Sequence, residues 1–222
     1  MDVQSNGLFI SFEGPDAAGK STQIRLLANY FNKLNYQNIV TRDPGGTAFG
    51  QKIRKILLAK ETNVAPITEL LLYAADRSQH VYELIKPSLD KGIIVICDRY
   101  IDSSVAYQGY GRQIPVSLIN HLNNIATNKL IPDITFLLDI DTDISLRRRD
   151  SSNLDRLESE SSEFHKRVRQ GYLKTARLYP QRIHIINARK PISVMHHDIK
   201  HILREKFKTL FSKNEIIAHE EN

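Results

Sequence analysis

The most informative stretch of the sequence is FEGPDAAGKSTQ, residues 12–23. It contains Gly14, Gly19, Lys20 and Ser21 in the order G-x-x-x-x-G-K-[ST], which is the pattern of a phosphate-binding loop, or P-loop. The two glycines let backbone amides approach phosphate oxygens closely. Lys20 adds a positive charge, and the Ser21 hydroxyl can bind Mg²⁺. The stretch therefore predicts a site for phosphate groups.

The residues on either side of this loop supply the context that such a site needs. Residues 8–13, LFISFE, are apolar and aromatic, as in a buried strand. After the loop, apolar residues recur at helical spacing at Ile24, Leu27, Phe31 and Leu34. A strand, a loop and a helix in this order favour nucleotide binding over a glycine turn that fits the pattern by chance.

Four further stretches have the composition of short buried strands, and segments with helical periodicity lie between them. The stretches are residues 38–43, 92–98, 134–140 and 183–188. Alternating strands and helices predict an α/β fold, with a five-stranded, mostly parallel sheet and helices on both faces. In such a sheet, ligands bind outside the carboxyl ends of the strands.

The length of 222 residues and the lack of a linker predict one domain over residues 1–212, followed by a polar tail over 213–222. The net charge of +6 suits anionic small molecules and nucleic acid alike, so it selects neither. Cys97 lies among aliphatic residues and suits a buried strand better than a disulfide. With no long apolar run in the chain, we expect a cytoplasmic protein without a membrane partner.

Residues outside the P-loop distinguish between the classes of P-loop protein. Asp98 ends the strand predicted at 92–98, where a second carboxylate commonly holds Mg²⁺ through water, so Ser21 and Asp98 are the predicted metal residues. A GTP-dependent switch needs Asn-Lys-x-Asp, and the sequence at 128–131, NKLI, lacks the aspartate. Basic residues near the strand ends favour a transferase that holds two anionic substrates over a nucleic-acid motor.

Four further motifs, taken with the P-loop, resemble those of bacterial thymidylate kinases over roughly residues 8–207. They are TRDPGGT at 41–47, YAADR at 73–77, DRYIDSSVAYQGYGR at 98–112 and LDRLE at 154–158. The resemblance implies a P-loop nucleoside monophosphate kinase fold with a lid. It also implies transfer of the γ-phosphoryl group of ATP to dTMP with Mg²⁺, a homodimer, and no nucleic-acid partner.

The resemblance assigns roles to individual residues. Asp16 would contact the sugar 3′-hydroxyl, and Arg99 would bind the acceptor phosphate. Arg77 would read the thymine edge, and Tyr73 would pack on the base. Asp43, where many relatives have Glu, belongs to a loop that shapes the acceptor site. Ser104, Tyr107 and Gln108 would complete the dTMP pocket, and ATP would be bound by Gly14, Pro15, Asp16, Ala17, Ala18, Gly19, Lys20, Ser21 and Thr22.

The lid is expected over residues 147–158, RRRDSSNLDRLE. Some family members place an arginine in the P-loop, where this chain has Ala17 and Ala18, so the lid would have to supply it. Arg149 and Arg156 are the candidates, and they complete a predicted catalytic set with Lys20, Asp16 and Arg99. A kinase of another nucleotide or nucleoside, and a non-catalytic nucleotide-binding protein, remain as alternatives.

Overall fold

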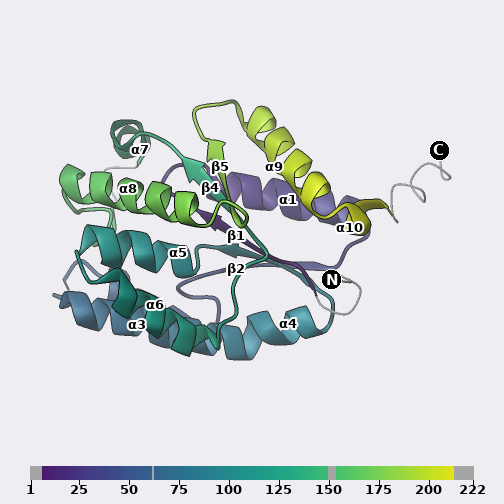
Figure 1. The fold of residues 1–222 in the computed structure, drawn as a ribbon. Helices are drawn as coiled ribbons and strands as arrows, with labels where there is room; N and C mark the ends of the chain where they lie inside the picture. The colour runs from purple at the N-terminus through teal and green to yellow at the C-terminus, as the bar shows by residue number, and fades with distance from the viewer. Residues whose placement is uncertain (1–6, 62, 150–153, 213–222) are drawn as a thin grey trace.

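The computed structural model describes residues 7–61, 63–149 and 154–212 (Figure 1). The predicted tail at 213–222 and the centre of the predicted lid, 150–153, lie outside the described residues. A single five-stranded sheet forms the centre of the molecule, in the order β2-β3-β1-β4-β5. The strands are β1 (Phe9–Glu13), β2 (Asn38–Arg42), β3 (Ile94–Asp98), β4 (Ile134–Asp139) and β5 (Ile183–Asn187).

All neighbouring strands are parallel, so the predicted α/β fold is confirmed, and each predicted strand is present within two residues at either end. The register explains how the site is assembled. Phe12 of β1 pairs with Asp98 of β3, and Asp98 pairs with Arg42 of β2. The loops that follow these three strands therefore begin side by side at one edge of the sheet.

Helices cover both faces of the sheet, as predicted (Figure 1). On one face lie α1 (Lys20–Lys33), α9 (Ile192–Lys206) and α10 (Lys208–Ser212). The other elements are α2 (Ala48–Leu58), α3 (Pro66–His80), α4 (Lys86–Asp90), α5 (Ile101–Ser104), α6 (Val116–Thr127), α7 (Thr142–Arg148), α8 (Ser162–Leu178) and two π-helical segments, η1 (Val81–Ile85) and η2 (Val105–Gly111).

The alternation of side chains along β1 divides the core between the two faces. Ile10 and Phe12 pack with Phe31 of α1 and Ile199 of α9, whereas Phe9 packs with Ile85 of η1 on the opposite face. Each of these side chains is at most 1% exposed. Burial on both faces explains why the strand sequences are nearly continuous apolar runs.

No helix in the described part of the chain has the length and apolar composition that a membrane span requires.

Candidate active site

The P-loop connects β1 to α1 and has the backbone geometry that its glycines predict. Gly14 and Gly19 have φ angles of 131° and 95°, which residues with a side chain rarely adopt. A Cβ on Gly14 would also lie 2.3 Å from the Leu138 carbonyl oxygen of β4. Gly14 therefore lets the loop turn closely against the sheet, and α1 begins at Lys20 with its amides toward the loop.

The Lys20 ammonium is held by the loop itself. Its Nζ donates to the carbonyl oxygens of Gly14 at 3.1 Å and Pro15 at 2.8 Å. Burial, reinforced by the charge of Arg99, lowers the pKa of Lys20 to about 8 despite nearby carboxylates. An anion that enters the loop would therefore offer this ammonium a stronger partner than the two neutral carbonyls do.

Ser21 and Asp98 line one pocket together with Lys20 and Arg42, which we call the P-loop pocket. Asp98 Oδ1 is buried, and no residue in the described part of the chain gives it a hydrogen bond. A free carboxylate oxygen beside a hydroxyl suits Mg²⁺, which usually takes few protein ligands and completes its shell with phosphates and water. Among the described residues, no group of three or more His, Cys, Asp or Glu side chains could hold a metal. The residues fit an ion that arrives with a nucleotide.

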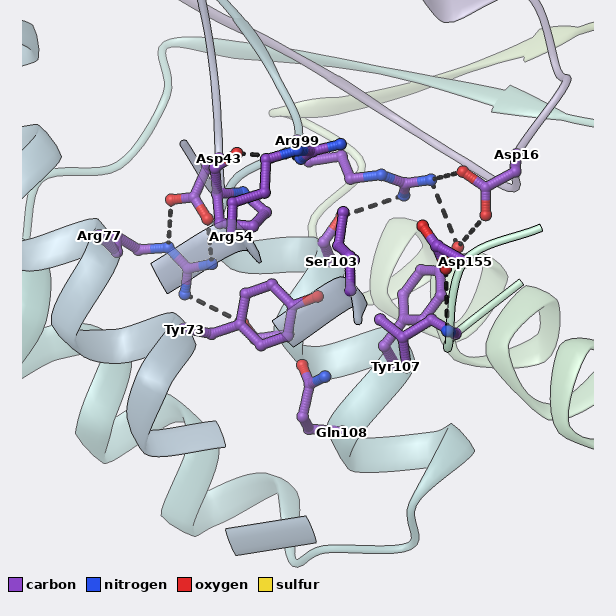
Figure 2. A pocket seen from close by; sticks show the side chains of 14 residues that line it. Asp16, Asp43, Arg54, Tyr73, Arg77, Arg99, Ser103, Tyr107, Gln108 and Asp155 are labelled. Atoms are coloured by element: carbon purple, nitrogen blue, oxygen red, sulfur yellow. Dashed lines mark hydrogen bonds and ion pairs between the residues drawn. The ribbon is translucent and has the colours of Figure 1, made fainter. Parts of the chain in front are cut away.

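A second cavity, the deep pocket, adjoins the P-loop pocket (Figure 2). Both are lined by Asp16, Asp43, Arg54 and Arg99, so these residues stand at the junction. Farther in, the deep pocket is lined by Tyr73, Arg77, Ser103, Ser104, Tyr107, Gln108 and Asp155. Every residue predicted for the dTMP site therefore lines this one cavity.

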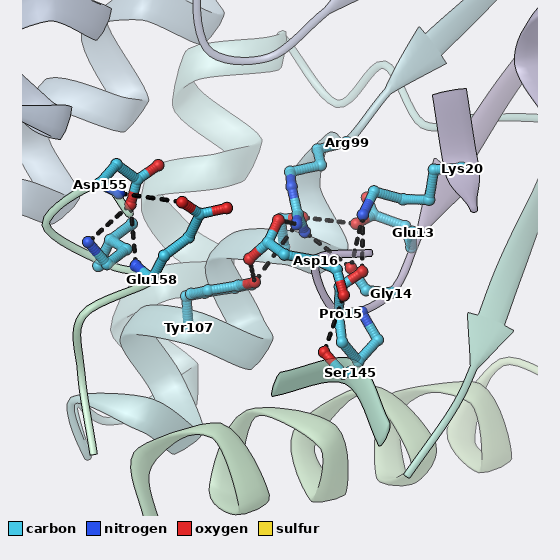
Figure 3. A network of polar contacts seen from close by, with 12 residues as sticks. Glu13, Gly14, Pro15, Asp16, Lys20, Arg99, Tyr107, Ser145, Asp155 and Glu158 are labelled. Atoms are coloured by element: carbon cyan, nitrogen blue, oxygen red, sulfur yellow. Dashed lines mark hydrogen bonds and ion pairs between the residues drawn. The ribbon is translucent and has the colours of Figure 1, made fainter. Parts of the chain in front are cut away.

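Arg99 reaches the P-loop from the end of β3 (Figure 3). Its guanidinium donates to Asp16 Oδ1 at 2.5 Å, to the Gly14 carbonyl at 2.9 Å and to the Tyr172 hydroxyl at 2.9 Å. The backbone of Arg99 has a φ of 71°, which is uncommon for a residue with a side chain. Such a conformation persists only where surrounding contacts fix it.

Asp16 lies where several positive charges converge. Its carboxylate accepts from Arg99 and from the Tyr107 hydroxyl at 3.1 Å, and Arg149 lies 3.8 Å away. Burial alone would raise the pKa of Asp16, but the charges of Arg99, Lys20 and Arg149 hold it well below its usual range. Asp16 is therefore an ionised acceptor at the boundary between the two pockets.

Glu13, which was not predicted as a site residue, shares the partners Ser103 and Tyr172 with Arg99. Its carboxyl accepts from the Tyr100 amide at 2.8 Å, the Ser103 hydroxyl at 2.6 Å and the Tyr172 hydroxyl at 3.2 Å. Burial, together with the charge of Asp102, raises the pKa of Glu13 to about 8. Glu13 is the last residue of β1. A charged residue at the end of a buried strand was the signal in the sequence that could have identified it.

Arg77 lies at the inner end of the deep pocket and is 1% exposed. Its Nε and Nη2 donate to both oxygens of Asp43, at 2.8 and 3.0 Å. Its remaining N–H groups reach the Ser104 hydroxyl, the Asn123 side chain and the Tyr100 carbonyl. These five hydrogen bonds equal the number of N–H groups in a guanidinium, so protein acceptors already use all of them. The assignment of Arg77 to the thymine edge stays a prediction, and the Ser104 hydroxyl lies beside it in the same cavity.

The two arginines predicted for the lid lie at different ends of the site. Arg149 follows α7 and donates to the Glu158 carbonyl at 3.0 Å, close to Asp16 and the P-loop. Arg156 donates to the Leu57 carbonyl at 2.8 Å and to Glu69 at 2.7 Å, and it lines neither pocket. The structure thus brings Arg149, but not Arg156, to the junction of the two pockets.

Arg42, one of the basic residues predicted near the strand ends, was given no role, and Arg54 was missed as a site residue. Arg42 ends β2 and lines the P-loop pocket, and Arg54 of α2 lines both pockets while donating to the Pro44 carbonyl at 3.0 Å. Arg54 stands in an ordinary amphipathic helix, so only the packing of α2 reveals its orientation.

A third cavity continues from the P-loop on the side away from the deep pocket. It is lined by Gly19 and Thr22 of the loop region, by Arg148 of α7, and by the segment from Ala188 to Ile192 after β5. Arg148 is fixed there by a bond of 3.4 Å from Nη1 to the Ala188 carbonyl. A nucleotide with its phosphates in the P-loop could place its base in this cavity.

Comparison with known proteins gives one consistent result. Residues 12–199 match the family model described as thymidylate kinase. The thymidylate kinase of Caldanaerobacter subterraneus is 45% identical over 202 residues, covering 91% of this chain and 97% of that protein. That of a Sulfurihydrogenibium species is 48% identical over 201 residues, covering 90% and 98%. The crystal structure of thymidylate kinase from Ehrlichia chaffeensis superposes with a TM-score of 0.75 at 38% identity, covering 90% of this chain and 99% of that one.

Proposed function

Because this chain belongs to the thymidylate kinase family and phosphorylates dTMP to dTDP, we propose that its two adjoining pockets hold the two substrates. ATP is the donor in the P-loop pocket, and dTMP is the acceptor in the deep pocket. The observation that carries this assignment is the junction itself, where Asp16, Arg54 and Arg99 line both pockets. The two phosphate chains would meet there.

The donor site is built by backbone amides and positive charge. The P-loop residues from Gly14 to Thr22 surround the phosphates, and Lys20 exchanges its loop carbonyls for phosphate oxygens. Mg²⁺ held by Ser21 and Asp98 would neutralise charge on the donor phosphates. The adenine would occupy the cavity beside Arg148.

The acceptor site fixes dTMP at both ends. Arg99 and Arg54 are positioned for its phosphate, and the ionised Asp16 can accept a hydrogen bond from the sugar 3′-hydroxyl. Tyr73, 9% exposed, offers its ring to the base, while Ser104, Tyr107 and Gln108 line the remaining walls. Such positioning brings the acceptor oxygen in line with the donor γ-phosphorus.

Transfer builds negative charge between the two nucleotides, so the chain must supply cations there. Lys20, Arg99 and Arg149 lie around Asp16 at this point. Arg149 is the candidate for the arginine that the P-loop lacks, since Arg156 is bound to Glu69 instead. Arg99 also keeps the acceptor phosphate beside the donor.

The assignment includes a cytoplasmic homodimer. Phe49 and Ile56 of α2 and Ile67 and Leu71 of α3 are each about half exposed, and the two helices pack side by side. A second copy of the chain would remove these apolar side chains from water.

A coupled ADP-release assay tests the proposal. The protein, ATP and Mg²⁺ are supplied in turn with dTMP, dCMP, dGMP and dAMP. We expect dTMP to be strongly preferred. Equal turnover of dTMP and dCMP would refute the assignment of the deep pocket to the thymine base, and no ADP release with any acceptor would favour a non-catalytic nucleotide-binding protein.

A further inference from the structure

Glu69 is a buried carboxylate that lines neither the P-loop pocket nor the deep pocket. It lies in the first turn of α3 and is 0% exposed. Oε1 accepts from Gln108 Nε2 at 2.9 Å and from Arg112 Nε at 3.3 Å. Oε2 accepts from Arg112 Nη2 at 3.1 Å and from Arg156 Nη2 at 2.7 Å. Each oxygen therefore has two donors, and two of the three partners are guanidinium groups.

This arrangement fixes which way the Gln108 amide faces. A carboxylate between two guanidinium groups only accepts hydrogen bonds, so the amide nitrogen of Gln108 must point toward Glu69. The amide oxygen is then directed away from Glu69, toward Tyr73 and the deep pocket (Figure 2). Gln108 is 1% exposed and belongs to the π-helical segment η2, so packing keeps its side chain in place.

Ser104, which lines the same cavity as Gln108, can donate a hydrogen bond. Ser104 Oγ accepts from Arg77 Nη1 at 3.0 Å, which leaves its hydroxyl hydrogen for another acceptor. The deep pocket thus offers a donor at Ser104 and an acceptor at Gln108. Thymine has a carbonyl oxygen at C4 and an N–H at N3, which complement this pair. Cytosine has an unprotonated N3, which would place a second acceptor against the Gln108 oxygen, so it mismatches the pocket at N3.

We propose that Glu69 is a positioning residue that sets base selectivity, because it holds the Gln108 amide with its oxygen toward the N3–H of the acceptor base. This inference rests on the proposed placement of dTMP in the deep pocket. Arg112 and Arg156 keep Glu69 in place, which gives Arg156 a role at the base end of the site rather than at the phosphates.

The Glu69→Gln variant tests the proposal, since glutamine can donate as well as accept and would let the Gln108 amide turn over. We expect the ratio of kcat/KM for dTMP to that for dCMP to fall about tenfold or more, the effect of one mispaired buried hydrogen bond. The kcat at saturating dTMP should stay within about threefold, since no group at the phosphates changes. In a Gln108→Ala background, Glu69→Gln should produce no further change in the ratio.

Glu160→Gln is the matched control. Glu160 also pairs with Arg112, at 2.5 Å, but has no bond to Gln108, so the ratio should stay at its wild-type value. Thermal unfolding checks that each variant is folded. Should Glu69→Gln not fold, Glu69→Asp keeps the charge between the two arginines but withdraws the carboxylate from Gln108, and the same loss of selectivity is expected.

Three results would overturn the proposal. These are an unchanged ratio in a folded Glu69 variant, an equal loss in Glu160→Gln, or the same loss with and without Gln108. If the wild-type protein itself did not prefer dTMP over dCMP, the proposed function would fail instead, so the two failures are distinguishable.

Discussion

Asp16 links the donor loop to the acceptor, because it belongs to the P-loop and its carboxylate is bound by Arg99 and Tyr107 from elements that follow β3. The surrounding positive charges hold its pKa well below the usual range, so it stays ionised throughout the working pH range of an enzyme. An ionised carboxylate at the edge of the acceptor pocket can accept a further hydrogen bond, and the 3′-hydroxyl is the donor that the sugar of dTMP offers.

We expect wild-type protein to use 3′-deoxy-dTMP much less well than dTMP, because the missing hydroxyl leaves Asp16 with an unmet hydrogen bond at a cost of about 1 to 3 kcal/mol. Values of kcat/KM for the two acceptors measure the difference. In Asp16→Ala the difference should vanish. Equal use of the two acceptors by the wild-type protein would show that Asp16 does not contact the sugar.

Glu13 makes stability depend on pH in an unusual direction. Burial raises its pKa from 4.5 to about 8, so the folded protein retains a proton that the unfolded chain loses above pH 4.5. The stabilisation from this group is complete below pH 4.5 and is lost as pH rises to about 8, with a slope of at most about 1.4 kcal/mol per pH unit.

The Glu13→Gln variant mimics the protonated acid and removes this dependence. We expect its Tm relative to the wild-type protein to increase steadily between pH 5 and pH 8, because over this range the wild-type chain must take up a proton at Glu13 when it folds. Differential scanning calorimetry across this range measures the change. A Tm difference that is constant with pH would show that Glu13 does not titrate there.

Among the secondary-structure elements, the segment after α7 carries two arginines that look equivalent in the sequence but lie at different places in the site. Arg149 and Arg156 both flank the polar centre of the predicted lid, whose residues 150–153 lie outside the described part of the chain. Arg149 lies 3.8 Å from Asp16, whereas Arg156 is bound to Glu69 on α3. Ser145 of α7 also donates to the Asp16 carbonyl at 2.8 Å, which ties this helix to the P-loop (Figure 3).

We expect Arg149→Ala to lower kcat far more than Arg156→Ala does, because an arginine at the transferring phosphoryl group is worth roughly 10³ to 10⁵ in rate. The KM for dTMP should change little in Arg149→Ala. Steady-state kinetics of both variants and of the double variant provide the test. A double variant with most of the wild-type kcat would show that neither arginine supplies the catalytic charge.

The elements that the sequence predicts well are those with local signals. The P-loop pattern, the apolar strands and the helical stripes each lie within one stretch of chain, and all are present in the structure. Glu13 carried a local signal, a charge at the end of a buried strand, but its role, like the roles of Arg54 and Glu69, depends on contacts between distant segments. Glu69 of α3 meets Gln108 of η2 and Arg156, which are 39 and 87 residues away, and no local pattern marks such a meeting. The bond between Arg77 and Asp43 was missed for the same reason.

In the whole molecule, α2 and α3 pack side by side, and each carries two apolar side chains that are about half exposed. We expect Leu71→Arg to convert a homodimer into a monomer, because it places a charge among apolar side chains that a second copy would cover. Light scattering after size exclusion measures the mass. Ile185→Arg on β5, at a position of similar exposure, is the control and should leave the mass unchanged. A monomeric wild-type protein would contradict the proposed homodimer.

The fold places the two substrate pockets next to each other because β1 pairs with β3, so that the P-loop and the segment beginning with Arg99 start side by side. Each pocket therefore has its own charged residue for phosphate, with Lys20 serving the donor and Arg99 the acceptor. It follows that substitutions 79 residues apart, at neighbouring positions in space, should have different kinetic effects.

Initial rates measured over a matrix of ATP and dTMP concentrations for Lys20→Ala and Arg99→Ala distinguish these two roles. Both variants should lose most of their kcat. Lys20→Ala should mainly raise the KM for ATP, and Arg99→Ala should mainly raise the KM for dTMP, each by about tenfold or more for the loss of a charged contact to a phosphate. If Arg99→Ala left both turnover and the KM for dTMP unchanged, Arg99 would be only a structural partner of Asp16, and the division of the site into donor and acceptor pockets would be wrong.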